Sequence, residues 1–156
     1  MTSIGLDHLD WLPENEQTVE KIIYEKTSTL LKSNIIVAKQ SNKKITDSIK
    51  KIISNNSSDK YFHNENYSFT MKENDFFYYE DQLGRIKLPI PNVKGQFQLE
   101  NVSTAIAALR TLNDFDIKND HIHKGITKIN SIARLQEIKS GNFKELVKDH
   151  QLFVDG

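Results

Sequence analysis

The sequence predicts an α/β fold, because the spacing of its apolar residues changes along the chain. In the first third, short apolar runs alternate with segments whose apolar residues recur at helical spacing. The middle is rich in alternating aromatic residues, which is typical of antiparallel strands. Helical spacing then returns before two last strand-like segments. This order predicts a parallel sheet with crossover helices, a small antiparallel meander, two helices and a hairpin.

The start of the chain predicts a strand, a helix, a strand and a helix in that order. Residues 1–4 are a short strand end, and apolar residues then recur at helical spacing from Val19 to Leu31. Residues 35–38 are a continuous apolar run, which is typical of a buried parallel strand. Residues 43–54 place isoleucines on one face of a helix. Since parallel strands need crossover connections, these elements predict a parallel sheet.

The rest of the chain predicts three further groups of elements. Aromatic alternation predicts a meander between about residues 60 and 88, whose last strand is ended by prolines. Apolar residues at helical spacing predict two helices near 99–113 and 118–129. Residues 134–138 and 151–154 are strand-like and predict a terminal hairpin.

Composition excludes several classes of protein. The chain has 156 residues, 37% of them hydrophobic, and no run of about 18 apolar residues that could cross a membrane. It has no cysteine, which excludes a disulfide scaffold and a thiolate metal site, and no N-terminal signal segment, so we predict a cytoplasmic protein. Its 21 basic and 21 acidic residues cancel, whereas a broad nucleic-acid-binding face normally needs a basic excess. We therefore expect neither a membrane nor a nucleic acid as a partner.

Two segments near the amino terminus carry residues suited to catalysis. Asp7, His8 and Asp10 follow the first predicted strand, where an imidazole and carboxylates suit a divalent cation or acid–base catalysis. The alternative is a surface cluster of hydrogen bonds. Lys26 falls near the end of the first predicted helix, where a lysine is normally solvated and compatible with the helix dipole.

Two further residues are candidates for nucleotide contacts. Asn101 ends a GQFQLEN segment that starts at Gly95, and its amide could bind a purine edge or a phosphate, or cap the following helix. Arg134, one of three arginines, could clamp a phosphate or be an ordinary surface residue. The sequence contains no GxxxxGK[ST], GxGxxG or GxSxG motif. The aromatic run 76–79 could stack on bases, but the neutral charge favours core and cross-strand packing.

Five segments, in order along the whole chain, resemble one family. They are residues 2–12 (TSIGLDHLDWL), 22–26 (IIYEK), 95–101 (GQFQLEN), 133–136 (ARLQ) and 154–156 (VDG). Together they resemble motifs of folylpolyglutamate synthase/dihydrofolate synthase, a member of the Mur ligase superfamily. The resemblance implies a partial Mur-ligase central domain and the first strands of a C-terminal domain.

This resemblance implies a reaction and a set of site residues. The family is an amide-bond-forming ligase of folate biosynthesis and one-carbon metabolism. ATP phosphorylates the carboxylate of a folate or dihydropteroate, and the amine of L-glutamate then attacks the acyl phosphate. By motif, His8 would be a Mg²⁺ ligand, and Lys26 would be the lysine that is carbamylated in the family. Asn101, Arg134 and Asp155 would contact ATP.

The sequence also departs from the family pattern. The P-loop, the next metal-binding carboxylate and the folate loop lie upstream in the family, and this sequence has none of them. Pro13 stands where the family has glycine, Phe97 where it has histidine, and Ala133 where it has glycine.

We therefore predict a truncated fragment of the ligase. Residues 1–130 would be the second half of the ATP-binding central domain, and residues 131–156 the start of a truncated C-terminal glutamate-ligase domain. The fragment is expected to be inactive alone and to work with an upstream chain that carries the P-loop. The alternative is a non-catalytic remnant, or a small interaction module without ligase activity.

Overall fold

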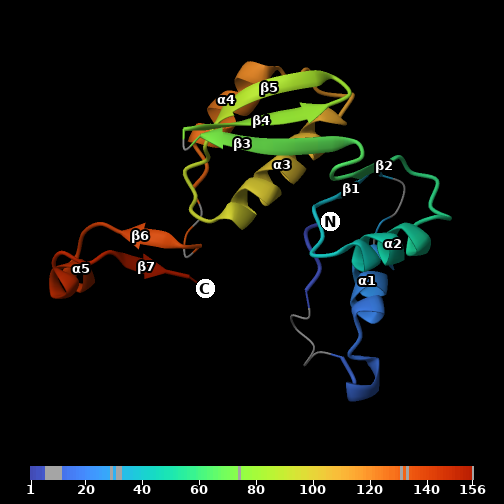
Figure 1. Cartoon of the computed structure of the whole chain (residues 1–156), viewed down its shortest axis with the longest axis horizontal. Helices are drawn as coiled ribbons and strands as arrows, with labels where there is room; N and C mark the ends of the chain where they lie inside the picture. Colours follow the sequence, from blue (N-terminus) through green and yellow to red (C-terminus); the bar gives the residue numbers. More distant parts are fainter. Residues whose placement is uncertain are drawn as a thin grey trace.

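The fold is an α/β arrangement that ends in a separate hairpin (Figure 1). This computed structural model describes residues 1–5, 12–28, 30, 33–73, 75–130, 132 and 134–155. The elements are η2 (Glu14–Glu16), α1 (Val19–Ser28), β1 (Ile35–Val37), α2 (Lys43–Ile52), β2 (Lys60–Phe62), β3 (Tyr67–Glu73), β4 (Phe76–Asp81), β5 (Gly84–Pro89), α3 (Gln96–Arg110), α4 (Asn119–Thr127), β6 (Gln136–Ile138), α5 (Asn142–Val147) and β7 (Leu152–Val154). No described helix is long and apolar enough to cross a membrane.

The predicted parallel sheet is confirmed in β1 and β2, which α2 connects as a crossover helix. Asn42 caps α2 by accepting a hydrogen bond from the backbone N–H of Ile45, at 3.1 Å. Residues 1–4, the first predicted strand, do not form a regular strand. Met1 nevertheless pairs with β1, on the edge of β1 opposite β2. Its N-terminal amine donates to the carbonyl of Ile36 at 2.6 Å, and its carbonyl accepts from Ala38 N–H at 2.9 Å. This pattern is that of a parallel ladder, so β1 lies between two neighbouring segments.

Side chains from α1, α2 and the sheet form the first of two apolar clusters. Ile23, Val37 and Ile49 are fully buried there, and Ile4 packs with them. All three residues of β1 are buried, because helices α1 and α2 lie against the sheet and α3 also contacts β1. Burial of this strand on all sides explains its continuous apolar sequence.

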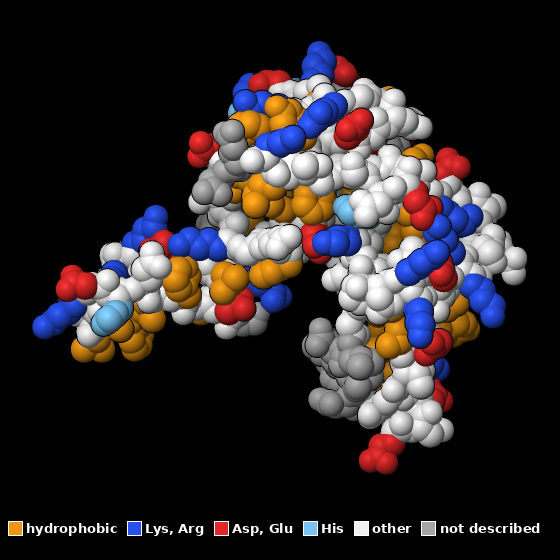
Figure 2. All heavy atoms as spheres, viewed as in Figure 1, with side chains coloured by type: hydrophobic (Ala, Val, Ile, Leu, Met, Phe, Trp, Pro, Cys, Tyr) orange, Lys and Arg blue, Asp and Glu red, His pale blue; other side chains and the backbone are white. Residues whose placement is uncertain are grey.

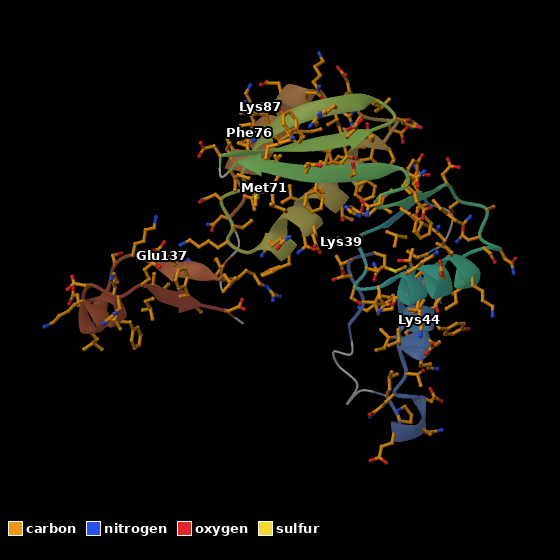
Figure 3. The ribbon with its side chains drawn as sticks, in the orientation of Figure 1. Lys39, Lys44, Met71, Phe76, Lys87 and Glu137 are labelled. Atoms are coloured by element: carbon orange, nitrogen blue, oxygen red, sulfur yellow. The ribbon has the colours of Figure 1, made fainter. Side chains whose placement is uncertain are left out.

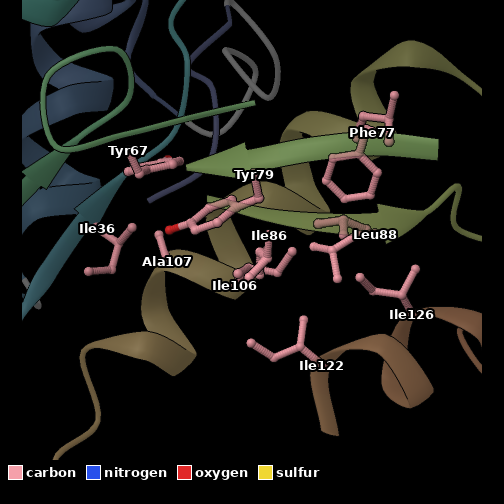
Figure 4. Close-up of a cluster of buried hydrophobic side chains, with 12 residues drawn as sticks. Ile36, Tyr67, Phe77, Tyr79, Ile86, Leu88, Ile106, Ala107, Ile122 and Ile126 are labelled. Atoms are coloured by element: carbon pink, nitrogen blue, oxygen red, sulfur yellow. The ribbon is translucent and has the colours of Figure 1, made fainter. Parts of the chain in front are cut away.

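The predicted meander is confirmed in β3, β4 and β5, which are adjacent and antiparallel, but it begins at Tyr67. Residues 60–62, which were expected in it, form β2 and pair parallel with β1. In β4, Phe77 and Tyr79 are fully buried, whereas the alternate residues Phe76 and Tyr78 lie on the opposite face (Figures 3 and 4). Two cross-strand cations cover the outer rings: Arg85 lies 3.9 Å from the centroid of Tyr78, and Lys87 lies 3.7 Å from that of Phe76. The aromatic run therefore serves core packing and cross-strand pairing.

Helix α3 joins the parallel sheet to the meander and fills the second apolar cluster (Figure 4). It begins at Gln96, three residues earlier than predicted, because Gly95 takes φ +105°. A Cβ on Gly95 would lie 2.5 Å from the Phe97 ring, so only glycine fits this turn. The hydroxyl of Tyr67 donates to Val37 O at 3.0 Å and lies 3.1 Å from Thr104 Oγ1, which connects β3, β1 and α3.

A buried ion pair fixes the other end of α3. Arg110 Nε donates to Asp81 Oδ2 at 2.7 Å, its Nη2 donates to Oδ1 at 3.0 Å, and the two side chains are only 8% and 9% exposed. Arg110 Nη1 also donates to Asn119 Oδ1, which brings α4 to the pair. The hydroxyl of Tyr79 donates to Asp81, and burial together with the Asp81 charge raises the pKa of Tyr79 well above its usual value.

The terminal hairpin is confirmed in β6 and β7, which pair antiparallel. The sequence analysis did not predict α5, the six-residue helix between them. It is short, and its apolar residues Phe143 and Leu146 are 76% and 78% exposed. Hydrophobic side chains gather on the surface at this end of the molecule (Figure 2).

Replacing Arg110 with methionine is expected to destabilise the fold by about 3–5 kcal/mol, because it leaves the Asp81 carboxylate buried without its partner. The matched control is Lys124→Met, which removes the exposed ion pair with Asp120 and should cost about 0.5 kcal/mol or less. Urea denaturation of the two variants measures this difference. Equal losses of free energy of unfolding would show that the Arg110 pair adds nothing beyond a surface pair.

Candidate functional site

The carboxyl end of β1 forms one part of the candidate site. Lys39 follows β1, and its Nζ pairs with Glu100 Oε1 at 3.0 Å (Figure 3). Since Glu100 precedes Asn101 on α3, this ion pair holds the Asn101 segment next to the sheet edge. Ligands of open α/β sheets bind at such carboxyl edges. Ligand pockets commonly measure about 300–1,000 Å³, and the cavity beside Lys39 measures ≈ 580 Å³.

Asn101 lies inside α3, so its role as a helix cap is excluded. Its Nδ2 donates to Gln98 Oε1 at 3.4 Å, and the residue is exposed. The buried Gln98 therefore fixes one side of the amide, while the other side faces solvent.

His63 follows β2 and lines the same cavity as Lys39. Its ring lies 5.5 Å from the rings of both Tyr67 and Phe69, and its buried Nε2 has no hydrogen-bond partner. Burial lowers the pKa of His63, the charge of Lys39 lowers it further, and Glu100 acts in the opposite direction. The imidazole is therefore neutral at neutral pH.

The hairpin forms the other part of the candidate site. Arg134 is exposed and lines a cavity of ≈ 210 Å³, together with the loop before α3 and residues of β6. The next residue, Leu135, has φ +47°, a strained left-handed conformation for a leucine. Leu135 N–H donates to Asp155 Oδ1 at 3.2 Å. The Asp155 carboxylate thus supports the strained turn beside Arg134, and the structure brings these two predicted residues together.

Lys94 contacts both strands of the hairpin and was missed in the sequence analysis. Its Nζ pairs with Glu137 Oε2 at 2.8 Å on β6 and lies 4.5 Å from the ring centroid of Phe153 on β7. The hydrogen bond from Lys94 lowers the pKa of Glu137, and the charges of Lys139 and Lys144 act in the same direction. A lone lysine followed by glycine carries no motif, so no sequence signal could have found it.

Lys26 does not join the other predicted residues. It is exposed in the last turn of α1, and its side chain forms no hydrogen bond or ion pair with another residue that the structure describes. Helix α1 ends beside the turn before β2, where Asn56 Nδ2 donates to Leu30 O at 2.7 Å. That turn is at the amino end of β2, whereas Asn101 lies near the carboxyl end of β1. His8 falls in residues 6–11, which lie outside the described residues.

The described residues do not by themselves fit a magnesium ion. No group of three or more His, Asp or Glu side chains among them could hold a metal. Mg²⁺ requires several oxygen ligands in near-octahedral geometry, which these residues do not supply.

These features define the class of the fold. The chain has a folylpolyglutamate synthase-like fold, which is a Mur-ligase-like fold, and it matches solved structures of this class over nearly its whole length. No protein-family model matches the sequence, and no curated protein matches it closely.

Three solved structures show the likeness. The E. coli FolC in complex with DHPP and ADP has 25% sequence identity and a TM-score of 0.74, and the match covers 99% of this chain and 33% of that one. A folylpolyglutamate synthase complex with AMPPCP and folate has 20% identity and a TM-score of 0.79, with 99% and 37% covered. The Thermotoga maritima folylpolyglutamate synthase has 18% identity and a TM-score of 0.69, with 89% and 32% covered. This chain thus spans about a third of the length of each of them.

The stability of the fold is expected to fall as the pH drops below about 6.5, in part because of His63. A lowered pKa means that the unfolded chain binds the proton more readily than the folded chain does. The contribution of His63 to the free energy of unfolding is therefore complete above the unfolded-state pKa and is lost as the pH falls toward the folded-state pKa. Replacing His63 with phenylalanine keeps a ring beside Tyr67 and Phe69 and removes the unpartnered nitrogen.

The measurement is the free energy of unfolding in urea between pH 8 and pH 5. We expect His63→Phe to reduce the pH dependence and to change stability at pH 8 by about 1 kcal/mol or less. An unchanged pH dependence would show that His63 does not contribute to it.

Proposed function

We propose that this chain is part of an ATP-dependent ligase that adds L-glutamate to the carboxylate of a folate or dihydropteroate. The observation that carries the proposal is the match of 99% of the chain to E. coli FolC in complex with DHPP and ADP. The five family-like segments, in the same order along the chain, support it independently. ATP would supply the phosphoryl group that activates the carboxylate as an acyl phosphate.

Arg134, which lines the hairpin cavity, and Asp155, which accepts a hydrogen bond from the neighbouring Leu135, are proposed to contact ATP. The Arg134 guanidinium lines this cavity and is suited to stabilise charge on phosphate oxygens. One oxygen of Asp155 accepts from Leu135 N–H, which leaves the other to accept hydrogen bonds from nucleotide hydroxyls. The support of Leu135 by Asp155 would orient Arg134 before the nucleotide binds.

Asn101, Lys26 and His8 are the other residues proposed to belong to the ligase site. The solvent-facing side of the Asn101 amide is available to ATP. Lys26, as the family's carbamylated lysine, and His8, as a Mg²⁺ ligand, rest on the resemblance alone. We propose that residues 1–130 belong to the ATP-binding central domain and residues 131–156 to the glutamate-ligase domain.

A second polypeptide is proposed to complete the ligase. Phosphoryl transfer depends on holding the phosphates and Mg²⁺, and a P-loop normally supplies the backbone cradle and its lysine. The sequence has no such motif, and the chain spans about a third of the solved structures that it matches. We propose the cytoplasm as the compartment in which both chains would meet.

The test is glutamate incorporation into dihydropteroate and tetrahydrofolate, with ATP and Mg²⁺ present. The purified chain alone should show no turnover, because phosphate positioning is incomplete. Mixed with a polypeptide that carries the P-loop segment of a related ligase, it should turn over. Arg134→Ala should abolish this turnover, since the guanidinium is proposed to contact the phosphates.

Arg85→Ala is the matched control, because Arg85 covers Tyr78 on the meander, away from the hairpin cavity. It should leave turnover in the mixture unchanged. Turnover by the chain alone would overturn the need for a second polypeptide. No turnover in any mixture would favour a non-catalytic remnant or interaction module.

A further inference from the structure

Lys94 contacts both strands of the hairpin from the body of the fold, which is residues 1–130. It lies in the loop between β5 and α3, immediately before Gly95. Its ammonium pairs with Glu137 on β6 at 2.8 Å and lies 4.5 Å from the Phe153 ring on β7. One side chain thus holds two strands that are distant from it in sequence.

The same loop forms one wall of the hairpin cavity. Asn92, Val93 and Lys94 line it from the body, and Arg134 and Glu137 line it from the hairpin. The Lys94–Glu137 pair therefore crosses from one wall to the other, and the length of this pair sets the distance between the walls. Arg134 is three residues from Glu137, so its position relative to the body depends on the same contact.

We propose that Lys94 is a positioning residue that sets the hairpin, and with it Arg134 and Asp155, at a fixed distance from the body of the fold. This inference deepens the proposed function, on which it rests, by naming the residue that shapes the ATP cavity. Lys94 also neutralises Glu137, whose carboxylate would otherwise face a bound phosphate across a cavity of only ≈ 210 Å³.

An ion pair with a purely structural role would affect global stability and not the orientation of the hairpin. Exposed pairs are individually weak, and the side chains of Lys94 and Glu137 are 50% and 24% exposed. Loss of this pair should therefore leave the body folded and widen the range of orientations of the hairpin. Orientation of the hairpin, rather than global stability, is the property that Lys94 controls.

Because the chain has no cysteine, two can be introduced without interference. Nitroxide labels at Asn113→Cys, after α3, and Glu145→Cys, on α5, report the distance between body and hairpin by pulsed electron paramagnetic resonance. Both positions are exposed. We expect one narrow distance distribution in the parent chain, a broader one in Lys94→Met and Glu137→Gln, and a narrow one again in Lys94→Arg, which keeps both the ion pair and the cation on the Phe153 ring.

Lys124→Met, which removes an exposed ion pair on α4, is the control and should keep the narrow distribution. Circular dichroism of each variant verifies that the helices remain folded. A narrow distribution in both Lys94→Met and Glu137→Gln would overturn the proposal, and so would a broad distribution in Lys94→Arg.

This readout needs neither ATP nor turnover, so its failure is distinct from a failure of the proposed function. In a mixture that turns over, Lys94→Met should raise the KM for ATP by about two- to fivefold, the effect of losing one exposed ion pair. The KM for glutamate should stay unchanged, and Lys94→Arg should keep the KM for ATP of the parent chain. An equal rise in both KM values would indicate a general loss of structure and would contradict the positioning role.

Discussion

The hydroxyl of Tyr67 makes the contact on which the arrangement of this molecule depends. It donates to Val37 O and lies within hydrogen-bond distance of Thr104 Oγ1, so it connects the meander, the parallel sheet and α3 at one buried point. Burial raises the pKa of this hydroxyl, which keeps it protonated and able to donate. Because α3 is fixed here and at the Arg110–Asp81 pair, its first turns have a defined place beside the carboxyl end of β1.

The candidate site has two halves, one positioned by apolar core packing and the other by polar contacts. Near β1, Lys39 and Glu100 lie on elements that pack against a buried apolar core. Asn101, which follows Glu100, therefore has a rigid position. At the hairpin, Arg134 depends on a strained Leu135, on the Asp155 carboxylate that supports it, and on Lys94. The first half is therefore rigid, whereas the geometry of the second half depends on a few polar contacts at the hairpin.

Much of the fold could be predicted from the sequence, since apolar spacing records which face of each element is buried. Phe77 and Tyr79 alternate with Phe76 and Tyr78, and the structure buries the first pair and exposes the second face. Helix α5 was not predicted, because six residues are too short a window for helical spacing to be decisive, although Phe143 and Leu146 are three residues apart. The start of α3 was misplaced because the turn at Gly95 depends on φ and on the nearby Phe97 ring.

By itself, the sequence determined the α/β class, the meander, the hairpin and the family-like order of five segments. The solved folylpolyglutamate synthases confirm the fold. Only the tertiary structure decided which polar groups meet. It brought the Asp155 carboxylate to the backbone N–H of Leu135, beside Arg134, placed Lys94 against both strands of the hairpin, and left Lys26 apart from Asn101. The physical reason is that periodicity records burial along one element, whereas contacts between polar side chains depend on how separate elements pack.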